Sequence, residues 1–137
     1  MEEVLIVVVE DNPDEARMTL QAIAQIKPPV LVGLACDGEE ALELLVGEHR
    51  RLPKLIFLDL KLPKVNGFEV LSALREDPGC NSIPVVIFSS SADPKDIDKA
   101  RTLGANDYIC KPIDWDDYVR VVCEAVATYV PSGSSLS

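Results

Sequence analysis

Short apolar runs recur along the chain, and each is followed by a charged or hydroxyl-bearing residue. Residues 4–9 and 55–58 are uninterrupted apolar runs, and residues 83–88 form another that a single proline interrupts. Runs of this length and composition are typical of strands buried on both faces, as in a parallel sheet. Two weaker runs, at residues 30–36 and 107–110, predict two further strands.

Helical spacing of apolar residues fills the intervals between these runs. Asn12 and Asp93 each precede a proline, and each pair predicts a helix start with an N-cap followed by proline in the first helical position. The first of these helices is expected to continue until two prolines at residues 28–29 stop it. The second is expected to end at Gly104, because glycine commonly follows the last turn of a helix.

Three further helices are expected. Asp37 is followed three residues later by Glu40, a pattern that resembles a capping box and predicts a helix start. Basic residues 49–51 are expected to close this helix, where they would complement its dipole. Residues 68–76 predict the next helix, and a last one from Trp115 carries apolar residues at helical spacing.

Five predicted strands thus alternate with five predicted helices along the chain. Right-handed crossovers between parallel strands place such helices on both faces of one sheet. We therefore predict an α/β fold with a doubly wound, five-stranded parallel sheet. Residues 1–130 are expected to form one domain, and residues 131–137 a polar, disordered tail.

Charge and cysteine content argue against several classes of function. The net charge of -10 argues against binding to nucleic acid or to an anionic membrane surface. No apolar run approaches the roughly 20 residues that span a bilayer, and the acidic start is unlike a signal peptide, so we expect a cytoplasmic protein. Four dispersed cysteines and one histidine argue against a zinc cluster, and that histidine, His49, is interpreted as a solvated helix-end residue.

Polar side chains gather at the predicted carboxyl ends of the strands. Glu10 and Asp11 follow the first strand, and Asp59 follows the third. If these strands are neighbours where the strand order reverses, three carboxylates converge and need a cation to relieve their repulsion. Mg²⁺ suits such oxygen ligands, while Ser89 and Lys111 add a hydroxyl donor and a positive charge. A carboxylate nucleophile, a metal and a cationic side chain are the components that form an aspartyl phosphate.

The order and spacing of these residues resemble the receiver domain of two-component response regulators over nearly the whole chain. The matching pieces are Glu10-Asp11, Asp59 within Leu58-Asp59-Leu60-Lys61-Leu62-Pro63, Gly67-Phe68-Glu69, Ser89, Tyr108 and Lys111-Pro112. Each piece is weak alone, but their order and spacing together are specific. The resemblance implies a flavodoxin-like (βα)5 fold with the strand order 2-1-3-4-5.

This resemblance implies a role for each carboxylate of the group. Asp59 would be the phosphoryl acceptor. Asp11 and Asp59 would bind Mg²⁺ directly, together with the backbone carbonyl of Lys61, and Glu10 would act through metal-bound water. Many members of the family carry Asp where this chain has Glu10, and the longer side chain changes the contact that it can make.

The other matching residues would respond to the phosphoryl group. Ser89 would bond a phosphoryl oxygen, and Tyr108 would move from an exposed to a buried position. Lys111 would bridge to the phosphate, with a cis bond to Pro112 holding the loop. We expect no separate enzymatic activity, because such a domain catalyses only its own phosphoryl transfer and dephosphorylation.

The resemblance also implies partners. The donor would be a sensor histidine kinase or a phosphotransfer protein, and the chain is similar to receivers that are paired with phytochrome-type kinases. No output domain follows the last helix, so we expect a stand-alone receiver that signals through a surface. Trp115, Tyr118 and Tyr129 on that helix exceed what one small core needs, and we expect a homodimer through this region.

Three other functions are weighed against this one. A phosphatase with an aspartate nucleophile would carry DxDxT after the first strand, where this chain has Glu10-Asp11-Asn12. A flavin binder of the same fold would need a phosphate cradle rich in Ser, Thr and Gly in that loop. A degenerate receiver that binds partners without phosphorylation is the main alternative, although the acceptor, Asp59, and the residues around it are intact.

Overall fold

The computed structural model describes residues 4–48, 50 and 52–130. Strands and helices alternate along these residues. In chain order they are β1 (Val4–Val9), α1 (Pro13–Ile23), β2 (Leu31–Ala35), α2 (Gly38–Val46), β3 (Leu55–Leu58), α3 (Gly67–Glu76), β4 (Val85–Ser89), α4 (Pro94–Thr102), β5 (Asp107–Cys110) and α5 (Trp115–Tyr129). His49 and the predicted disordered tail at residues 131–137 lie outside the described residues, so both predictions stand as they were.

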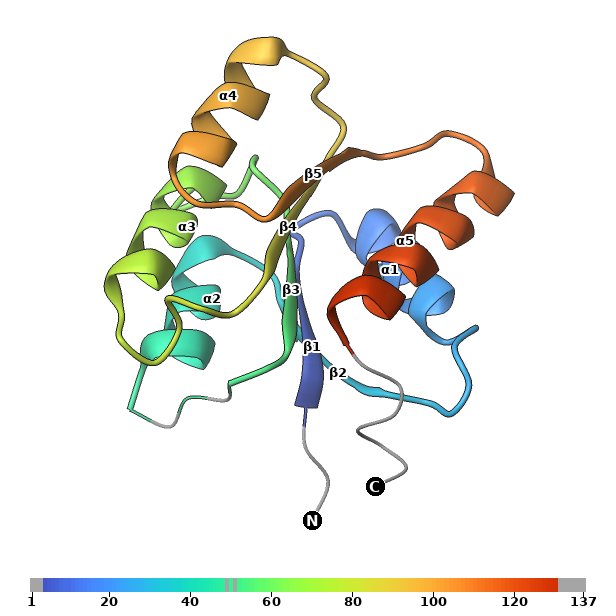
Figure 1. The fold of residues 1–137 in the computed structure, drawn as a ribbon, viewed down its shortest axis with the longest axis horizontal. Helices are drawn as coiled ribbons and strands as arrows, with labels where there is room; N and C mark the ends of the chain where they lie inside the picture. Colours follow the sequence, from blue (N-terminus) through green and yellow to red (C-terminus); the bar gives the residue numbers. More distant parts are fainter. Residues whose placement is uncertain (1–3, 49, 51, 131–137) are drawn as a thin grey trace.

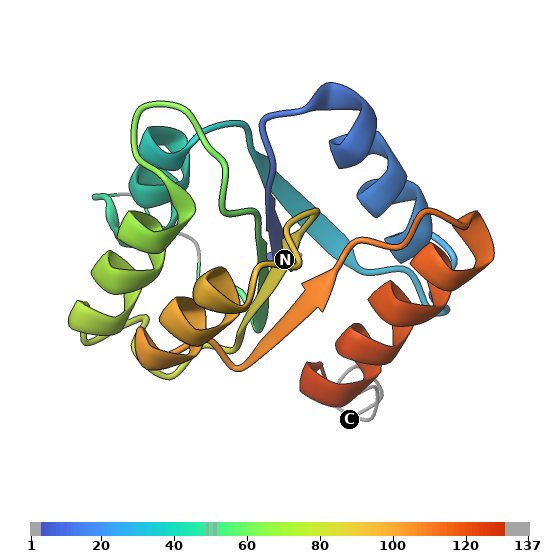
Figure 2. The ribbon, with the colours of Figure 1, turned by 90° about the horizontal axis from the view of Figure 1, so that it is seen from above.

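The strands form one parallel sheet in the order β2-β1-β3-β4-β5, so the predicted fold class and strand order are confirmed. Helices α1 and α5 cover one face of this sheet, and α2, α3 and α4 cover the other (Figures 1 and 2). None of the described helices combines the length and the apolar character that crossing a membrane requires.

The apolar runs are continuous because the central strands feed two cores. Successive side chains of a strand point to opposite faces of the sheet. Val7 and Val9 therefore pack toward α2, α3 and α4, whereas Ile6 and Val8 pack toward α1 and α5. β3 and β4 alternate in the same way, and all of their residues are buried. Burial on both faces leaves only the strand ends free to carry polar chemistry.

Most of the predicted helix starts are confirmed in detail. The side chain of Asn12 accepts hydrogen bonds from the backbone N–H groups of Asp14 and Glu15, at 2.9 and 3.1 Å, and α1 begins with a proline. Asp93 caps α4 in the same manner. Because N-caps satisfy backbone donors that have no partner inside the helix, they fix where each helix starts after its strand.

Two of the predicted helix ends are wrong. α1 ends at Ile23, well before the prolines, because the N–H groups of Gln25 and Ile26 bond carbonyls three residues back and tighten the chain after the helix. α2 ends at Val46, and its last turn carries no basic residue. Gly47 takes an extended conformation there, and a Cβ on it would lie only 2.3 Å from the carbonyl oxygen of Glu43.

The complete capping box lies at α3 rather than at α2. At α2, Asp37 accepts from the N–H of Glu40, but the Glu40 carboxylate reaches past Asp37 to the N–H of Cys36, at 3.2 Å. At α3, Asn66 and Glu69 exchange both hydrogen bonds, each at 3.0 Å. This box starts α3 at Gly67, immediately after the loop that follows Asp59.

Candidate functional site at the carboxyl edge of the sheet

Strand register alone places Glu10 beside Asp59. Val9, the last residue of β1, pairs with Leu58, the last residue of β3, so the residues that follow them emerge together. The N–H of Asp59 donates to the carbonyl of Val9 at 3.1 Å, and the N–H of Glu10 donates to the carbonyl of Ala35 at 3.0 Å. Both acids are therefore fixed by the hydrogen bonds that pair β1 with β2 and β3, at the edge where open α/β sheets bind ligands.

Three carboxylates converge at this point. Glu10, Asp11 and Asp59 each place one carboxylate oxygen within 4.8 Å of the others. Glu10 and Asp59 are buried, at 3% and 8% exposure, whereas Asp11 is exposed. An all-oxygen donor set with one side open to water is what Mg²⁺ favours, because this ion keeps several of its waters. The donor chemistry therefore fits the metal that was predicted.

The loop after Asp59 is held close to the acids by two glycines. A Cβ on Gly67 would lie 2.3 Å from the carbonyl oxygen of Asp59, and a Cβ on Gly38 would lie 1.7 Å from that of Val65. No other residue type fits these approaches without moving the backbone. Lys61, whose carbonyl was predicted to join the metal ligands, lies in this loop with an exposed side chain.

Lys111 supplies the positive charge of the site. Its N–H donates to the carbonyl of Ser89 at 2.7 Å, which anchors the end of β5 to the end of β4. The Nζ atom is hydrogen-bonded to Glu10 and, at 2.6 Å, to Glu15, and it lies 3.7 Å from Oδ2 of Asp59. The ammonium group therefore lies closer to Glu10 and Glu15 than to Asp59.

The pKa values of Glu10 and Lys111, which are hydrogen-bonded to each other, are both shifted from their ordinary values. Burial raises the pKa of Glu10 to about 7, and repulsion from Asp59 adds to this rise against the lowering effect of the hydrogen bond with Lys111. Burial alone would lower the pKa of Lys111, but its hydrogen bonds to Glu10 and Glu15 outweigh this and raise it. Lys111 is therefore charged at neutral pH, and the site holds more negative charge than this one cation balances.

The two predicted switch residues, Ser89 and Tyr108, are both hydrogen-bonded to Ser91. Ser89 is fully buried, and its Oγ accepts from the N–H of Ser91 at 3.1 Å. The hydroxyl of Tyr108, which is half-buried, donates to the carbonyl of Ser91 at 2.8 Å. Ser91 itself donates through Oγ to Asp96 in the first turn of α4, at 2.6 Å. One short segment after β4 thus connects both predicted switch residues to α4.

The predicted cis bond before Pro112 is wrong. The bond between Lys111 and Pro112 is trans, and the cis bond among the described residues joins Lys27 to Pro28. The trans form is favoured intrinsically, so a cis form before Pro112 would need packing that selects it. The next residue, Ile113, is fully exposed and offers little such packing.

The expectation for the aromatic residues of α5 is wrong at Tyr118. Its ring is buried, lies edge-on to Phe88 with centroids 5.1 Å apart, and its hydroxyl is hydrogen-bonded to Thr19 at 2.8 Å. Tyr118 therefore serves the core between α1 and α5. Trp115 is 39% exposed and Tyr129 is half-buried, so only these two remain for a surface role.

Glu15 is the site residue that the sequence analysis missed. It lies in the first turn of α1, and its sequence position suggests only an acid near the positive end of a helix dipole. The signal that could have found it is geometric. α1 starts directly after β1, so its first turn lies beside the carboxyl edge of the sheet, within reach of the residue that follows β5.

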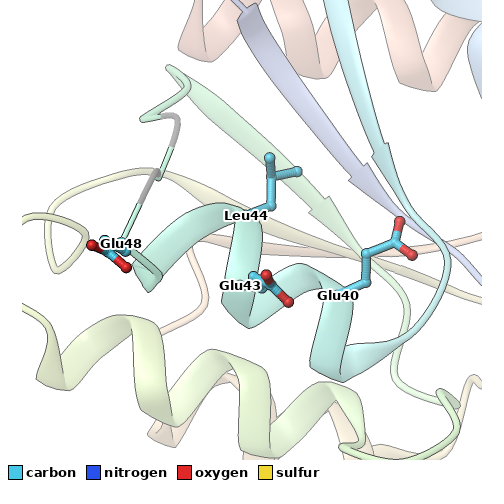
Figure 3. A pocket seen from close by; sticks show the side chains of 4 residues that line it. All are labelled: Glu40, Glu43, Leu44 and Glu48. Carbon is cyan, nitrogen blue, oxygen red and sulfur yellow. The ribbon is translucent and has the colours of Figure 1, made fainter.

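A second acidic group lies on α2, and it differs from the first. Glu40, Glu43 and Leu44 of α2 line a pocket together with Glu48, which lies just beyond the end of this helix (Figure 3). These three carboxylates belong to exposed residues, and the lining residues that the structure describes include neither a cation nor a hydroxyl group. The combination of buried acids with a buried ammonium group therefore distinguishes the carboxyl edge as the candidate site.

Comparison with known sequences finds receiver domains over most of the chain. The family model for the response regulator receiver domain matches residues 6–122. The probable methanogenesis regulatory protein FilR2 of Methanothrix harundinacea (strain 6Ac) is 35% identical over 123 residues, which cover 88% of this chain and 79% of that protein. An uncharacterized 14.6 kDa protein of Leptolyngbya boryana, from the sodA1 3' region, is 33% identical, with 92% of both chains covered.

Comparison with solved structures finds response regulators, among them a phytochrome response regulator. The phosphorylated cyanobacterial phytochrome response regulator RcpA has a TM-score of 0.86 and 33% identity, with 95% of this chain and 96% of that chain covered. The Mn(2+)-bound form of response regulator Rcp1 has a TM-score of 0.83 and 26% identity, with 93% and 95% covered. The likeness extends over nearly the full length of each chain.

Proposed function

Because this chain belongs to the family of response regulator receiver domains, we propose that Asp59 accepts a phosphoryl group in two-component signalling. The observation that carries the proposal is the position of Asp59, which lies buried between two other carboxylates and 3.7 Å from the ammonium group of Lys111. The donor would be a histidine kinase or a phosphotransfer protein. The likeness to RcpA, a phytochrome response regulator, favours a phytochrome-type kinase.

The transfer forms one bond and breaks one. A carboxylate oxygen of Asp59 attacks the phosphorus atom, the P–N bond to the donor histidine breaks, and the imidazole nitrogen leaves with the electron pair. Lys111 faces the negative charge on the phosphoryl oxygens, and burial strengthens this interaction. The domain would thus act on its own Asp59 and on no separate substrate.

Mg²⁺ is the cofactor that the donor set fits. Asp11 and Asp59 would hold it together with the carbonyl of Lys61, and Glu10 would contribute through a bound water. Bound there, the ion neutralises charge on the phosphoryl group and on the acids around it. Glu10 and Asp59 are fixed by strand pairing, so they need little rearrangement to meet it.

Phosphorylation would be read through the segment after β4. Ser89 would turn its hydroxyl from the N–H of Ser91 to a phosphoryl oxygen, and Tyr108, which bonds the carbonyl of Ser91, would follow inward. The surface near the start of α5, where Ile113 and Trp115 are exposed, would then carry the signal, and we propose a homodimer through it. Sedimentation of the Trp115→Ala variant tests that contact, because an unchanged dimer would exclude it.

A cytoplasmic location accords with the cysteines. Cys36, Cys80, Cys110 and Cys123 are free thiols in the structure, as expected in a reducing compartment.

Intact-protein mass after incubation with acetyl phosphate tests the proposed function. We expect one phosphoryl adduct that requires Mg²⁺ and is absent from Asp59→Asn, a substitution that keeps the size and removes the nucleophile. No adduct in any condition would instead favour a receiver-like module that binds partners without phosphorylation. An adduct that persists in Asp59→Asn would mean that another residue is the acceptor.

A further inference from the structure

The two carboxylates that bind Lys111 belong to different parts of the site. Glu10 is a member of the carboxylate group that fits Mg²⁺, and its position is set by strand pairing. Glu15 stands outside that group, in the first turn of α1, and its carboxylate accepts a hydrogen bond from the ammonium group at 2.6 Å. The proposed reaction assigns a role to the first of these acids and none to the second.

Glu15 is held firmly in position by its backbone. Its N–H donates to the side chain of Asn12 at 3.1 Å, and its carbonyl accepts from the hydroxyl of Thr19 at 3.1 Å. The hydroxyl of Tyr118 lies 3.5 Å from the same carbonyl and 2.8 Å from the hydroxyl of Thr19. Glu15 is thus fixed by the cap of α1 and by α5 at once, so its carboxylate is presented to Lys111 by a rigid support.

The two hydrogen bonds of Lys111 differ in the cost of breaking them. The Glu10 side chain is 3% exposed, so a Glu10 carboxylate without its partner would be buried and unpaired. The Glu15 side chain is 35% exposed, so water can solvate its carboxylate once the ammonium group has left. If Lys111 advances over the 3.7 Å that separates it from Asp59, Glu15 is the partner that it releases more easily.

We propose that Glu15 is a positioning residue, which holds Lys111 short of Asp59 and competes with the phosphoryl group for its ammonium. This inference rests on the proposed function of Asp59. Its consequence is that removal of the Glu15 charge frees Lys111 and tightens the binding of a phosphoryl group. The Mg²⁺ ligands are unaffected, because Glu15 is not among the carboxylates that converge there.

Beryllium fluoride, which binds carboxylates as a phosphoryl mimic, tests the proposal without a chemical step. It is titrated into Mg²⁺-saturated wild type, Glu15→Gln and Asp14→Asn, with the bound fluoride followed by ¹⁹F NMR. Asp14 is the matched control, because it adjoins Glu15, is 84% exposed and pairs with Arg17 instead of Lys111. We expect half-saturation of Glu15→Gln at a concentration about three- to ten-fold lower, the value of one hydrogen bond, and a change below about two-fold for Asp14→Asn.

The other results of this titration are informative in different ways. Equal behaviour of Glu15→Gln and Asp14→Asn, or weaker binding by Glu15→Gln, would overturn the role of Glu15 and leave the function of Asp59 untouched. Absence of binding by wild type, together with absence of an acetyl phosphate adduct, would overturn the proposed function and this inference with it. Mg²⁺ affinity without beryllium fluoride should change equally in both variants. Glu15→Ala, with the same expected direction, serves if Glu15→Gln folds poorly.

Discussion

The two edges of the sheet each hold a cation, and the partners of these cations differ. At the amino edge, Arg75 donates to the carbonyls of Ile83 and Gly104 and to the side-chain oxygen of Asn106, at 2.9, 3.0 and 2.9 Å. These acceptors precede β4 and β5, and all of them are neutral. At the carboxyl edge, the Nζ atom of Lys111 lies within 4 Å of three carboxylates, those of Glu10, Glu15 and Asp59.

The difference separates a structural role from a chemical one. The acceptors around Arg75 are neutral groups, so this site needs no additional ion. The Arg75 side chain links α3 to the two loops that precede β4 and β5. Lys111 leaves a surplus of negative charge among acids that are held together by strand pairing. Surplus negative charge of this kind favours the binding of an added cation, and it favours the protonation of one of the carboxylates. The first edge therefore stabilises the fold, while the second is prepared for a ligand.

Replacing Arg75 should give the largest change in stability. In Arg75→Ala, several backbone carbonyls lose a charged donor, and we expect the free energy of unfolding in urea to fall by about 3 kcal/mol. Added Mg²⁺ should recover none of this loss. Arg101→Ala, which removes an exposed arginine from α4, is the control and should change stability by less than about 0.5 kcal/mol. A loss below about 1 kcal/mol for Arg75→Ala would contradict the structural role of this edge.

Replacing Lys111 should give a smaller loss that depends on metal. Lys111→Met keeps the length of the side chain but leaves Glu10 and Asp59 without a cation, which we expect to cost about 2 kcal/mol at pH 7.5 without metal. Saturating Mg²⁺ should recover more than half of this loss, because the ion takes over the neutralisation. Equal losses with and without Mg²⁺ would mean that the two edges respond alike, and the distinction between them would fail.

The surplus negative charge at the carboxyl edge should also make the stability of the protein depend on pH. We expect this effect to be smaller than those of the Arg75 and Lys111 substitutions. The pKa of Glu10 is raised from 4.5 to about 7, so the folded state binds more protons than the unfolded state between these values. Stability from this group therefore falls as pH rises through that interval, and protonation restores it. Metal-free wild type should lose about 1 kcal/mol more between pH 5.5 and 7.5 than Glu10→Gln does. A steeper loss in Glu10→Gln would reverse the sign and refute the assignment.

The strands were predictable because their signals are local, whereas their order was implied by the resemblance to receiver domains. Each central strand is an apolar run, and burial on both faces requires that pattern whatever the neighbours are. Once β1 and β3 are neighbours, the pairing of Val9 with Leu58 sets Glu10 beside Asp59. The acids of the candidate site therefore followed from strand ends, with no knowledge of side-chain packing.

The partners of long side chains could not be predicted in this way. The contact of Lys111 with Glu15 joins residues 96 positions apart and depends on where the first turn of α1 lies relative to the end of β5. The burial of Tyr118 and the exposure of Trp115 depend on the rotation of α5 about its axis, which the hydroxyl of Thr19 helps to fix. Helical spacing predicts that both lie on one side of a helix but not which of them faces the core.

The most direct test of Asp59 as the acceptor is to locate the modified residue. Borodeuteride reduces an acyl phosphate to an alcohol, so a phosphorylated aspartate becomes a deuterated homoserine. Trypsin releases residues 55–61, a peptide in which Asp59 is the single acid. After acetyl phosphate and Mg²⁺, we expect the label at position 59 of this peptide. Label confined to the peptide that carries Glu10 and Asp11 would contradict the proposed chemistry of the carboxyl edge.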